Sequence, residues 1–404
     1  MQLLQLLLHY GLELAGGFLL LNCLYLLFFT VAGHFPERLL EVDRGPYHPT
    51  RLRHIGVFLP AYRADAVILA TAKAALRHPY EGTFQVVVIA DGLRAATVQA
   101  LWQAGAEVVE VAFERSTKGK ALLHALHTFP AAAFDIAVVL DADNLMGKGC
   151  LSNINRAFDL GYRVVQTHRT ALNQDTAFAL LDACNEEINN HIYRQGPFAL
   201  GLSSALIGSG MAFDYGYLQR LLTGIGETVG EDKELDFRIA RDRVKVGYLA
   251  DTYVYDEKID SARVFTQQRT RWLASQLEFL QKYAGEGFTQ LVRFGNVEFF
   301  NKAMQTFLVP RTLLIGVLGL LFLLSLVLPV GPPPGFWGGL LLLLAATLLL
   351  ALPARLYNGQ LLRAVVRLPY AILCMCLALL RVGRTQASFL ATPHRARVPS
   401  APLD

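Results

Sequence analysis

The sequence predicts an α/β domain held between apolar helices, and three observations support this fold class. Short apolar, β-rich runs alternate with helical stretches between residues 51 and 283. Long apolar runs lie on both sides of this region, and carboxylates and glycines recur where the strand-like runs end. Regular alternation of strand and helix is typical of right-handed β-α-β units. We therefore expect a parallel sheet with both faces covered by helices.

The composition excludes a disordered chain and a fully water-soluble enzyme. The 404 residues are 53% hydrophobic and 17% charged, with a mean hydropathy of +0.35, whereas a soluble chain carries about 25% charged residues. A net charge of +4 is too small to predict a nucleic-acid partner. Five cysteines without metal-ligand spacing predict reduced, structural thiols. They are Cys23, Cys150, Cys184, Cys374 and Cys376.

The first apolar run, residues 3–32, exceeds the roughly 20 residues that a membrane-spanning helix needs. It has no positively charged leader and no small-residue cleavage site, so we expect an anchor and not a removable signal peptide. Four arginines follow it: Arg38, Arg44, Arg51 and Arg53. By the positive-inside rule, residues 1–50 form a helix and a link that leads into a cytoplasmic domain. A bacterial inner membrane is the expected location.

The C-terminal part, residues 286–404, predicts further membrane helices and a basic tail. The apolar runs 313–330 and 336–352 predict two spans joined by a Pro/Gly turn outside the cytoplasm. The run 368–380 is shorter than a span and lies among arginines, so we favour an interfacial or re-entrant helix over a fourth span. Residues 287–305 mix aromatic and basic side chains, which predicts another helix on the membrane surface or, alternatively, an amphipathic core helix.

Four apolar runs in the central region, residues 51–285, predict buried strands, with helices between them. The strands are 55–59, 85–89, 107–111 and 136–140, and the helices are 64–76, 97–104 and 118–128. Ligands of an open parallel sheet bind at the carboxyl ends of its strands. The residues that follow these strands are therefore candidates for the functional site.

Three of the four strands end in residues with distinctive chemistry. These are Pro60-Ala61-Tyr62, Asp91 and Asp141-Ala142-Asp143. Two carboxylates separated by one residue can place oxygen atoms around a hard cation, and Mg²⁺ prefers a few carboxylates together with phosphate oxygens. Asp141 and Asp143 thus indicate a metal-bound diphosphate, with turn or capping aspartates as the alternative.

Two glycine motifs suit close approach to a ligand. Lys118-Gly119-Lys120 opens the helix after the third strand, where free amides and ammonium groups favour phosphate, although a solvated basic turn has the same sequence. Gly208-Ser209-Gly210 would let the backbone approach a ligand closely, although tight packing also explains it.

Two later motifs carry charge. Glu231-Asp232 opens a predicted helix over 233–241, so Asp232 is a helix cap or a general base. In a helix, Gln268, Arg271 and Trp272 share one face. An arginine beside an indole suits a diphosphate next to a sugar ring, and a surface helix with an extended arginine is the alternative. The chain has no Walker-type phosphate loop and no Gly-rich dinucleotide fingerprint.

In this order, the motifs resemble the membrane-embedded branch of the family 2 glycosyltransferases. This branch includes cellulose, hyaluronan, chitin and poly-N-acetylglucosamine synthases and ceramide glucosyltransferase. The resemblance covers about residues 51–283, and its most specific motif is Gln268-Arg269-Thr270-Arg271-Trp272. It implies a Rossmann-like GT-A fold over residues 51–285, a nucleotide-sugar donor, Mg²⁺ or Mn²⁺, and inversion at the anomeric carbon.

For the donor, the resemblance implies a nucleotide pocket formed by Pro60-Ala61-Tyr62 and Asp91. Lys118 or Lys120 would contact the base or the phosphates. Asp141 would hold the nucleotide and the metal ion, with Asp143 as the direct metal ligand.

For the reaction, the resemblance implies that Asp232, with Glu231 beside it, deprotonates the acceptor hydroxyl. Arg271 would neutralise the leaving diphosphate. Gln268, Trp272 and the Gly208-Ser209-Gly210 motif would shape the acceptor end of the site.

The chain departs from the family pattern at two places. Arg63-Ala64-Asp65 stands where relatives often have Asn-Glu, and Asp91-Gly92-Leu93 lacks a second aspartate. The tail motif Thr392-Pro393-His394-Arg395 resembles an ending seen in this branch. We expect it at the membrane surface near the catalytic domain, with a mobile basic tail as the alternative.

The first expectation for the activity is elongation of a polysaccharide through β-glycosidic bonds from a UDP-sugar. Three predicted spans are few for a polymer channel, which leaves open a partner subunit, a homo-oligomer, or sugar transfer to a membrane lipid instead. A non-catalytic binding or transport scaffold is disfavoured, because Asp141, Asp143 and Asp232 are all present. Membrane lipids are expected partners, and nucleic acid is not.

Overall fold

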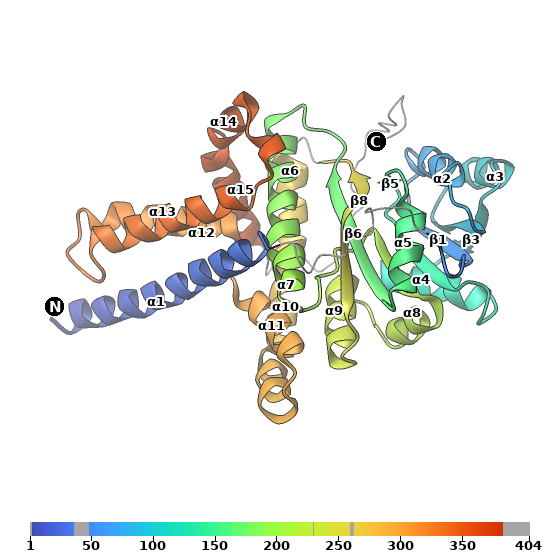
Figure 1. Ribbon diagram of the computed structural model, residues 1–404. Helices are drawn as coiled ribbons and strands as arrows, with labels where there is room; N and C mark the ends of the chain where they lie inside the picture. The colour runs from blue at the N-terminus through green and yellow to red at the C-terminus, as the bar shows by residue number, and fades with distance from the viewer. Residues whose placement is uncertain (1, 36–47, 229, 259–261, 383–404) are drawn as a thin grey trace.

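The computed structural model describes residues 2–35, 48–228, 230–258 and 262–382 (Figure 1). An α/β part forms one half of the molecule, and apolar helices from both ends of the chain form the other half. Arg38, Arg44 and the predicted tail motif at 392–395 lie outside the described residues.

The α/β part is built on a mixed sheet of eight strands in the order β3-β2-β1-β4-β7-β6-β8-β5. The strands are β1 Ile55–Tyr62, β2 Phe84–Asp91, β3 Glu107–Val111, β4 Ile136–Val139, β5 Leu145–Met146, β6 Val164–Ala171, β7 Met211–Asp214 and β8 Val246–Asp256. All four predicted strands are confirmed, and β1 and β2 continue further toward their carboxyl ends than predicted.

The parallel pairing expected for the four predicted strands is confirmed, but the complete sheet is mixed. The order β3-β2-β1-β4 is parallel, but β7 pairs antiparallel with both β4 and β6. β7 pairs with the first three residues of β6, and Gln166 of β6 lies opposite Met211, where β7 begins. The helical segment between these strands therefore does not make the crossover that parallel strands require.

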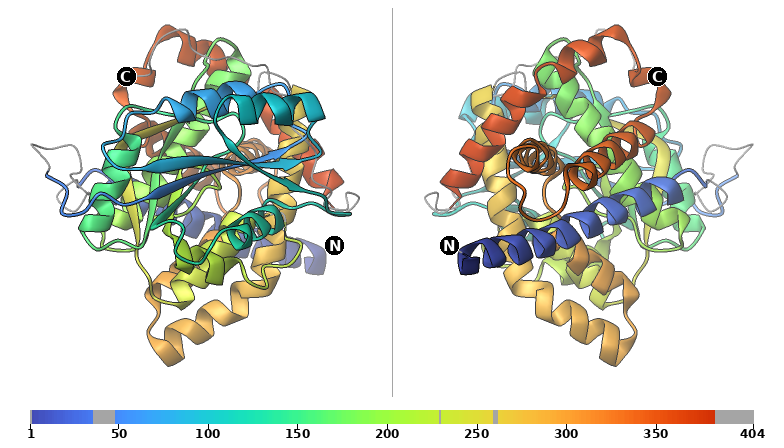
Figure 2. Two further views of the ribbon diagram at one scale, coloured as in Figure 1. Left: turned by 90° about the vertical axis from the view of Figure 1, so that its right-hand side faces the viewer. Right: turned by 90° about the vertical axis from the view of Figure 1, so that its left-hand side faces the viewer.

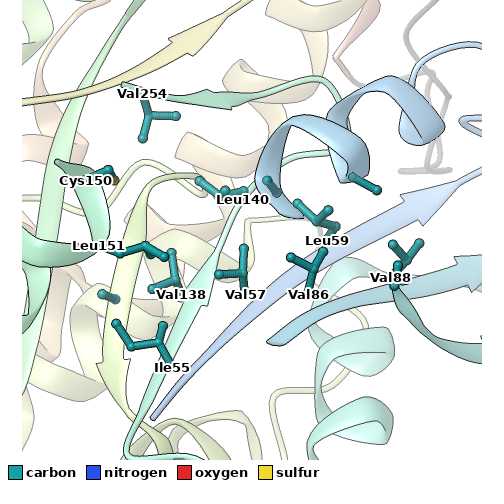
Figure 3. Packing of buried hydrophobic residues seen from close by; sticks show 14 of the residues in the cluster. Ile55, Val57, Leu59, Val86, Val88, Val138, Leu140, Cys150, Leu151 and Val254 are labelled. Atoms are coloured by element: carbon teal, nitrogen blue, oxygen red, sulfur yellow. The ribbon is translucent and has the colours of Figure 1, made fainter. Parts of the chain in front are cut away.

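Helices cover both faces of the sheet. They are α2 Ile68–Leu76, α3 Ala95–Gln103, α4 Lys118–Thr128, α5 Cys150–Asp159, α6 Ala177–Asn189, the π-helix η2 Asn190–Gln195, α7 Gly196–Ala199, α8 Tyr215–Leu222 and α9 Glu231–Arg241. Successive residues of a strand point to opposite faces, so Val57 and Leu59 pack with α2, α3 and α5 (Figure 3). Phe58 points to the other face, toward α4 and α8. This double burial explains why the strand-like runs of β1, β2 and β4 are almost continuously apolar.

The remaining helices come from the two ends of the chain. They are α1 Gln2–Ala32, α10 Ala262–Phe294, α11 Val297–Phe307, α12 Arg311–Ser325, α13 Pro334–Leu350, the 3₁₀ helix η3 Ala354–Leu356, α14 Gly359–Val365 and α15 Leu368–Arg381. α1 packs against α13, and the right-hand view of Figure 2 shows α1 in front, next to the orange helices. Cys23 and Phe29 of α1 share an apolar cluster with Leu314 and Trp337. The opposite face of α1 is exposed, with Leu14 at 79%.

Among the described residues, α1 is the one helix that is by itself long and apolar enough to cross a membrane. The predicted runs 313–330 and 336–352 do form helices, but α12 has 15 residues and α13 has 17, fewer than the roughly 20 of a typical span. α12 reaches the length of a span only together with α11, from which it bends by 53°.

The prediction of one helix over 287–305 is wrong, because the chain breaks between α10 and α11. Gly295 adopts a φ of +60°, which ends α10 in the left-handed conformation typical of helix C-termini. Asn296 then caps α11, accepting a hydrogen bond from the Phe299 amide at 3.1 Å. The helix predicted at 368–380 is confirmed as α15.

Candidate active site

A cavity of about 1290 Å³ lies at the carboxyl ends of β1, β2 and β4. Most of the residues that the sequence singled out line it. They are Pro60, Ala61, Tyr62, Asp91, Lys118, Asp141, Asp143, Gly208, Glu231, Asp232, Gln268, Arg271 and Trp272. Lys120, Ser209 and Gly210 do not line the cavity.

The nucleotide end of the cavity is formed by the last residues of β1 and β2. Tyr62 is paired in register with Asp91, and the buried Asp91 carboxylate accepts a hydrogen bond from Ser116. Asp65 belongs to Arg63-Ala64-Asp65, which stands where relatives often have Asn-Glu. Its carboxylate accepts hydrogen bonds from the Arg94 amide and the Thr97 hydroxyl. Asp65 therefore supports the start of α3.

Lys118 connects three of the predicted motifs. Its ammonium nitrogen lies 2.5 Å from Asp141 Oδ1, 2.5 Å from the Gly208 carbonyl oxygen and 3.9 Å from Glu231 Oε1. Burial lowers the pKa of Lys118, but the charges of Asp141 and Glu231 outweigh burial and hold this pKa above its ordinary value. Lys120, by contrast, pairs with Glu227 at 2.6 Å and lies outside the cavity.

The residues of the Gly208-Ser209-Gly210 motif have different roles, since one lines the cavity and two pack inside the protein. Only Gly208 lines the cavity. The buried Ser209 hydroxyl accepts a hydrogen bond from the Asp141 amide at 3.0 Å and donates one to Asn144 at 2.8 Å. Gly210 has a φ of +66°, and a Cβ there would collide with Thr167. Ser209 and Gly210 thus hold the end of β4 in place.

Glu231 and Asp232 are the first two residues of α9. The capping interpretation of Asp232 is wrong, because the N-cap residue is Gly230. Burial and the neighbouring charge of Asp232 raise the pKa of Glu231 to about 7, against the opposing charge of Lys118. Burial also raises the pKa of Asp232, whose Oδ1 accepts a hydrogen bond from the Lys233 amide at 2.8 Å.

The predicted helical face on α10 is confirmed, since Gln268, Arg271 and Trp272 all line the cavity. Burial lowers the pKa of Arg271, against the charge of Glu231. Arg269 was not singled out from the sequence, but it pairs with Asp182 and lies 4.0 Å from the centre of the Trp272 ring. Its position one helical turn before Trp272 is the signal that could have identified this stacking.

Sequence reasoning also missed a buried ionic network beside Asp141. Arg169 of β6 lies 3.9 Å from Asp141, 2.8 Å from Glu186 and 3.6 Å from Asp256. Lys258 lies 2.7 Å from Asp256. Asp256 ends a strand, as Asp91 does, so its position was a usable signal. Arg169 and Glu186 lie inside a strand and a helix, where the sequence offers no such signal.

The far end of the same cavity is apolar. Its wall there comes from α12, α13, α14 and α15, at Ile315, Leu341, Ala345, Leu348, Leu349, Leu361, Val365, Leu368, Ala371 and Met375. A single cavity therefore joins the carboxylates at the strand ends to the apolar C-terminal helices.

The carboxylates at the polar end fit a hard divalent cation bound together with a substrate. Within the described part of the chain, no three His, Cys, Asp or Glu side chains form a complete metal site. Asp141 and Asp143 nevertheless provide oxygen ligands at the cavity wall. Mg²⁺ is typically held by one or two carboxylates and completed by phosphate oxygens and water. The pair therefore suits a cation that arrives with a diphosphate.

The model of "Glycosyltransferase like family 2" matches residues 52–275, more than half of the chain. None of the curated proteins compared by sequence matches it. Mannosyltransferase PcManGT from Pyrobaculum calidifontis, solved with GDP-Man and Mn²⁺, has a TM-score of 0.51 and 17% identity, covering 95% of this chain and 97% of that chain. The similarity extends to the fold, which is the GT-A fold that the sequence predicts.

A second solved structure is less similar. Glucosyl-3-phosphoglycerate synthase from Mycobacterium tuberculosis, in complex with Mn²⁺, UDP and glucosyl-3-phosphoglycerate, has a TM-score of 0.33 and 20% identity. The match covers 54% of this chain and 78% of that chain.

Proposed function

Because the chain belongs to glycosyltransferase family 2, we propose that it transfers a hexose from a nucleoside-diphosphate sugar to a lipid acceptor at a membrane. The observation that carries the proposal is the continuity of the cavity, which begins at the strand-end carboxylates and ends among apolar helices. Residues 51–285 form the catalytic domain on the cytoplasmic side, and residues 1–50 and 286–404 attach it to the membrane.

The donor lies at the polar end of the cavity. The nucleoside contacts Pro60-Ala61-Tyr62 and Asp91, and Asp141 and Asp143 would hold Mg²⁺ or Mn²⁺ with the diphosphate. A divalent cation there supplies charge stabilisation for the departing diphosphate. UDP-sugars are the first donors to test, and GDP-mannose is the second, because the mannosyltransferase of similar fold was solved with GDP-Man.

The reaction is a direct displacement with inversion at the anomeric carbon. Asp232 takes the proton of the acceptor hydroxyl as its oxygen bonds to the anomeric carbon. The bond from that carbon to the diphosphate breaks, and its electron pair leaves with the nucleoside diphosphate. The raised pKa of Asp232 suits a base. Arg271 stabilises the leaving charge, and Lys118, buried between Asp141 and Glu231, holds these carboxylates in place.

The wall of the cavity favours a lipid over the polysaccharide that was the first expectation. A sugar polymer needs polar and aromatic contacts along its length, which Gln268 and the 42% exposed Trp272 can supply beside the catalytic groups. The α12–α15 end offers Leu, Ile, Val, Ala and Met side chains, which suit a hydrocarbon chain. Polymer elongation remains the second candidate, supported by the Gln268 to Trp272 motif.

The arrangement of the helices supports a membrane location. α1, α12 and α13 extend together away from the sheet (Figure 1). α14 lies on one side of their base, and α11 lies on the other. Val292 and Phe294, at the elbow between α10 and α11, are exposed apolar side chains. This is the pattern of a membrane segment flanked by interfacial helices.

The experiment uses the full-length protein in lipid nanodiscs with a panel of radiolabelled nucleotide sugars and Mg²⁺ or Mn²⁺. Transfer to lipid gives chloroform-soluble counts, whereas polymer synthesis gives ethanol-precipitable counts. Release of free nucleotide without a metal ion would contradict the proposed metal role. A protein inert toward every donor in the panel would contradict the transferase.

A further inference from the structure

Buried hydrogen-bonding atoms without a partner are concentrated in the residues that line this cavity. In the described part of the chain, most buried side-chain atoms that lack a partner belong to residues of its wall. They are Nε of Arg169, Arg194 and Arg269, Nη1 of Arg311, and Oε1 of Glu186 and Gln268. A buried donor without a partner costs about 1–3 kcal/mol. Since N–H donors predominate here, the cavity is suited to an anion.

Arg311 differs from the other arginines of this group. Arg169 and Arg269 each pair with a carboxylate, Glu186 and Asp182 respectively. Arg311 has no carboxylate oxygen within 4.0 Å among the described residues. Its Nη2 donates to the side-chain oxygens of Asn185 at 2.6 Å and Asn189 at 2.7 Å. Both partners are neutral, so the positive charge of Arg311 is uncompensated at close range.

The charge around Arg311 is positive overall. Five cations and three carboxylates of the cavity wall lie close together. Each of the three carboxylates pairs with Arg169, Lys258 or Arg269. The cations are Arg169, Arg194, Lys258, Arg269 and Arg311, and the carboxylates are Asp182, Glu186 and Asp256. A fourth carboxylate, Asp141, lies 3.9 Å from Arg169 and is also paired with Lys118.

Arg311 stands where the polar and apolar parts of the cavity meet. It is the first residue of α12, and Ile315, one turn further on, lines the apolar part. On its other side, Asn185 precedes Glu186, which pairs with Arg169 near Asp141. An acceptor with a charged head and an apolar chain would therefore place its charge at Arg311.

We infer that Arg311 binds a phosphate group of the acceptor, whose hydrocarbon chain lies between α12, α13 and α15. The inference rests on the proposed lipid acceptor and narrows it to a phosphate-bearing lipid. A guanidinium group is well matched to phosphate, because its planar N–H donors form paired, charge-assisted hydrogen bonds. Arg311 is a binding residue in this scheme, and Asp232 remains the base.

The test measures binding of hexyl phosphate to the full-length protein in detergent by titration calorimetry. Saturating UDP or GDP and Mg²⁺ are present, so that the donor site is occupied. Hexanol and inorganic phosphate are the comparison probes. Two variants lower the positive charge of the site by different routes. Arg311→Gln removes the guanidinium group, whereas Asn189→Asp keeps the arginine and supplies the carboxylate that it lacks. Arg293→Gln, an exposed arginine on α10, is the matched control.

Hexyl phosphate is expected to bind more tightly than either comparison probe. Arg311→Gln and Asn189→Asp should each weaken its binding about tenfold or more, equivalent to about 1.4 kcal/mol, and Arg293→Gln should bind as the wild type does. Asn189→Asp adds a counter-ion and should not lower the unfolding temperature, so it remains informative if Arg311→Gln fails to fold.

Wild-type affinity in Asn189→Asp would overturn the inference, as would equal affinity for hexyl phosphate and hexanol. Equal affinity for hexyl phosphate and inorganic phosphate would assign the site to free phosphate and overturn the lipid part. If the protein releases nucleotide but does not bind hexyl phosphate, the inference about Arg311 is refuted and the proposed transferase function stands. If the protein binds hexyl phosphate at Arg311 but is inert toward every donor, the proposed transferase function is refuted and the phosphate site stands.

Discussion

The ammonium group of Lys118 lies 2.5 Å from the carboxylate of Asp141, although one residue belongs to a helix and the other follows a strand. Lys118 opens α4, and Asp141 follows β4. The same ammonium group reaches Gly208 and Glu231. One buried cation therefore joins the donor side of the cavity to the carboxylates at the start of α9.

Asp232→Asn should lower turnover by about 10²–10⁴-fold, because the amide cannot accept the acceptor proton. Binding of the nucleotide should persist, since Asp232 lies in the first turn of α9 and the nucleoside is proposed to bind at the ends of β1 and β2. Turnover is measured as acceptor-dependent nucleotide release, and binding is measured by calorimetry. Asp251→Asn is the control, because Asp251 is an exposed aspartate in the middle of β8. Normal turnover in Asp232→Asn would remove this residue from the base role.

Glu231 should make the protein less stable as the pH rises. Burial and the charge of Asp232 raise its pKa from 4.5 to about 7. Between these values the folded chain keeps a proton that the unfolded chain releases, so the free energy of unfolding falls as the pH rises through this window.

Glu231→Gln is neutral at every pH and should therefore raise the unfolding temperature at pH 8 while changing it little at pH 4. Thermal unfolding followed by circular dichroism at both values checks this. Glu114→Gln, an exposed loop residue, should have no such pH-dependent effect. An equal effect of Glu231→Gln at pH 4 and pH 8 would show that ionisation of Glu231 is not its source.

Asp143→Asn should weaken Mn²⁺ binding about tenfold or more, because it removes an anionic oxygen ligand from a cation site that has few. The readout is the decrease of the free Mn²⁺ signal in electron paramagnetic resonance, with UDP present. Chelation with EDTA should abolish nucleotide release by the wild type, and added Mn²⁺ should restore it. Unchanged Mn²⁺ affinity in Asp143→Asn would exclude it as a ligand.

Gly210→Ala should destabilise the protein by about 1–3 kcal/mol, because its Cβ would collide with Thr167 and because the residue has a φ of +66°. Denaturant unfolding of the two proteins measures the difference. Gly216→Ala in α8 is the matched control, since its Cβ has no neighbour closer than 3.9 Å. A Gly210→Ala protein as stable as that control would contradict the packing role of the motif.

The first half of the fold was predictable because its signals are local. β3 and α4 have the bounds that the sequence predicts, since the buried valines of β3 and the Thr117 cap of α4 mark them within a few residues. The direction of β7 was not predictable in this way. It depends on where the chain returns after α6 and α7, and no local pattern specifies this.

The site was predictable to the extent that its residues end strands or begin helices. Asp141 and Glu231 stand at such positions. Sequence alone could not choose between Lys118 and Lys120, because the choice depends on which side of α4 faces β4. Arg311 gave no signal at all, because its partner Asn185 lies 126 residues earlier in the chain.

The two ends of the cavity are lined by different parts of the chain. Strand ends and the start of α9 line the carboxylate end, and the helices after residue 310 line the apolar end. Substitutions in one part leave the side chains of the other in place. Donor and acceptor preferences can therefore diverge independently, and exchanging the helices after residue 310 between related enzymes is a route to a new acceptor with an unchanged donor.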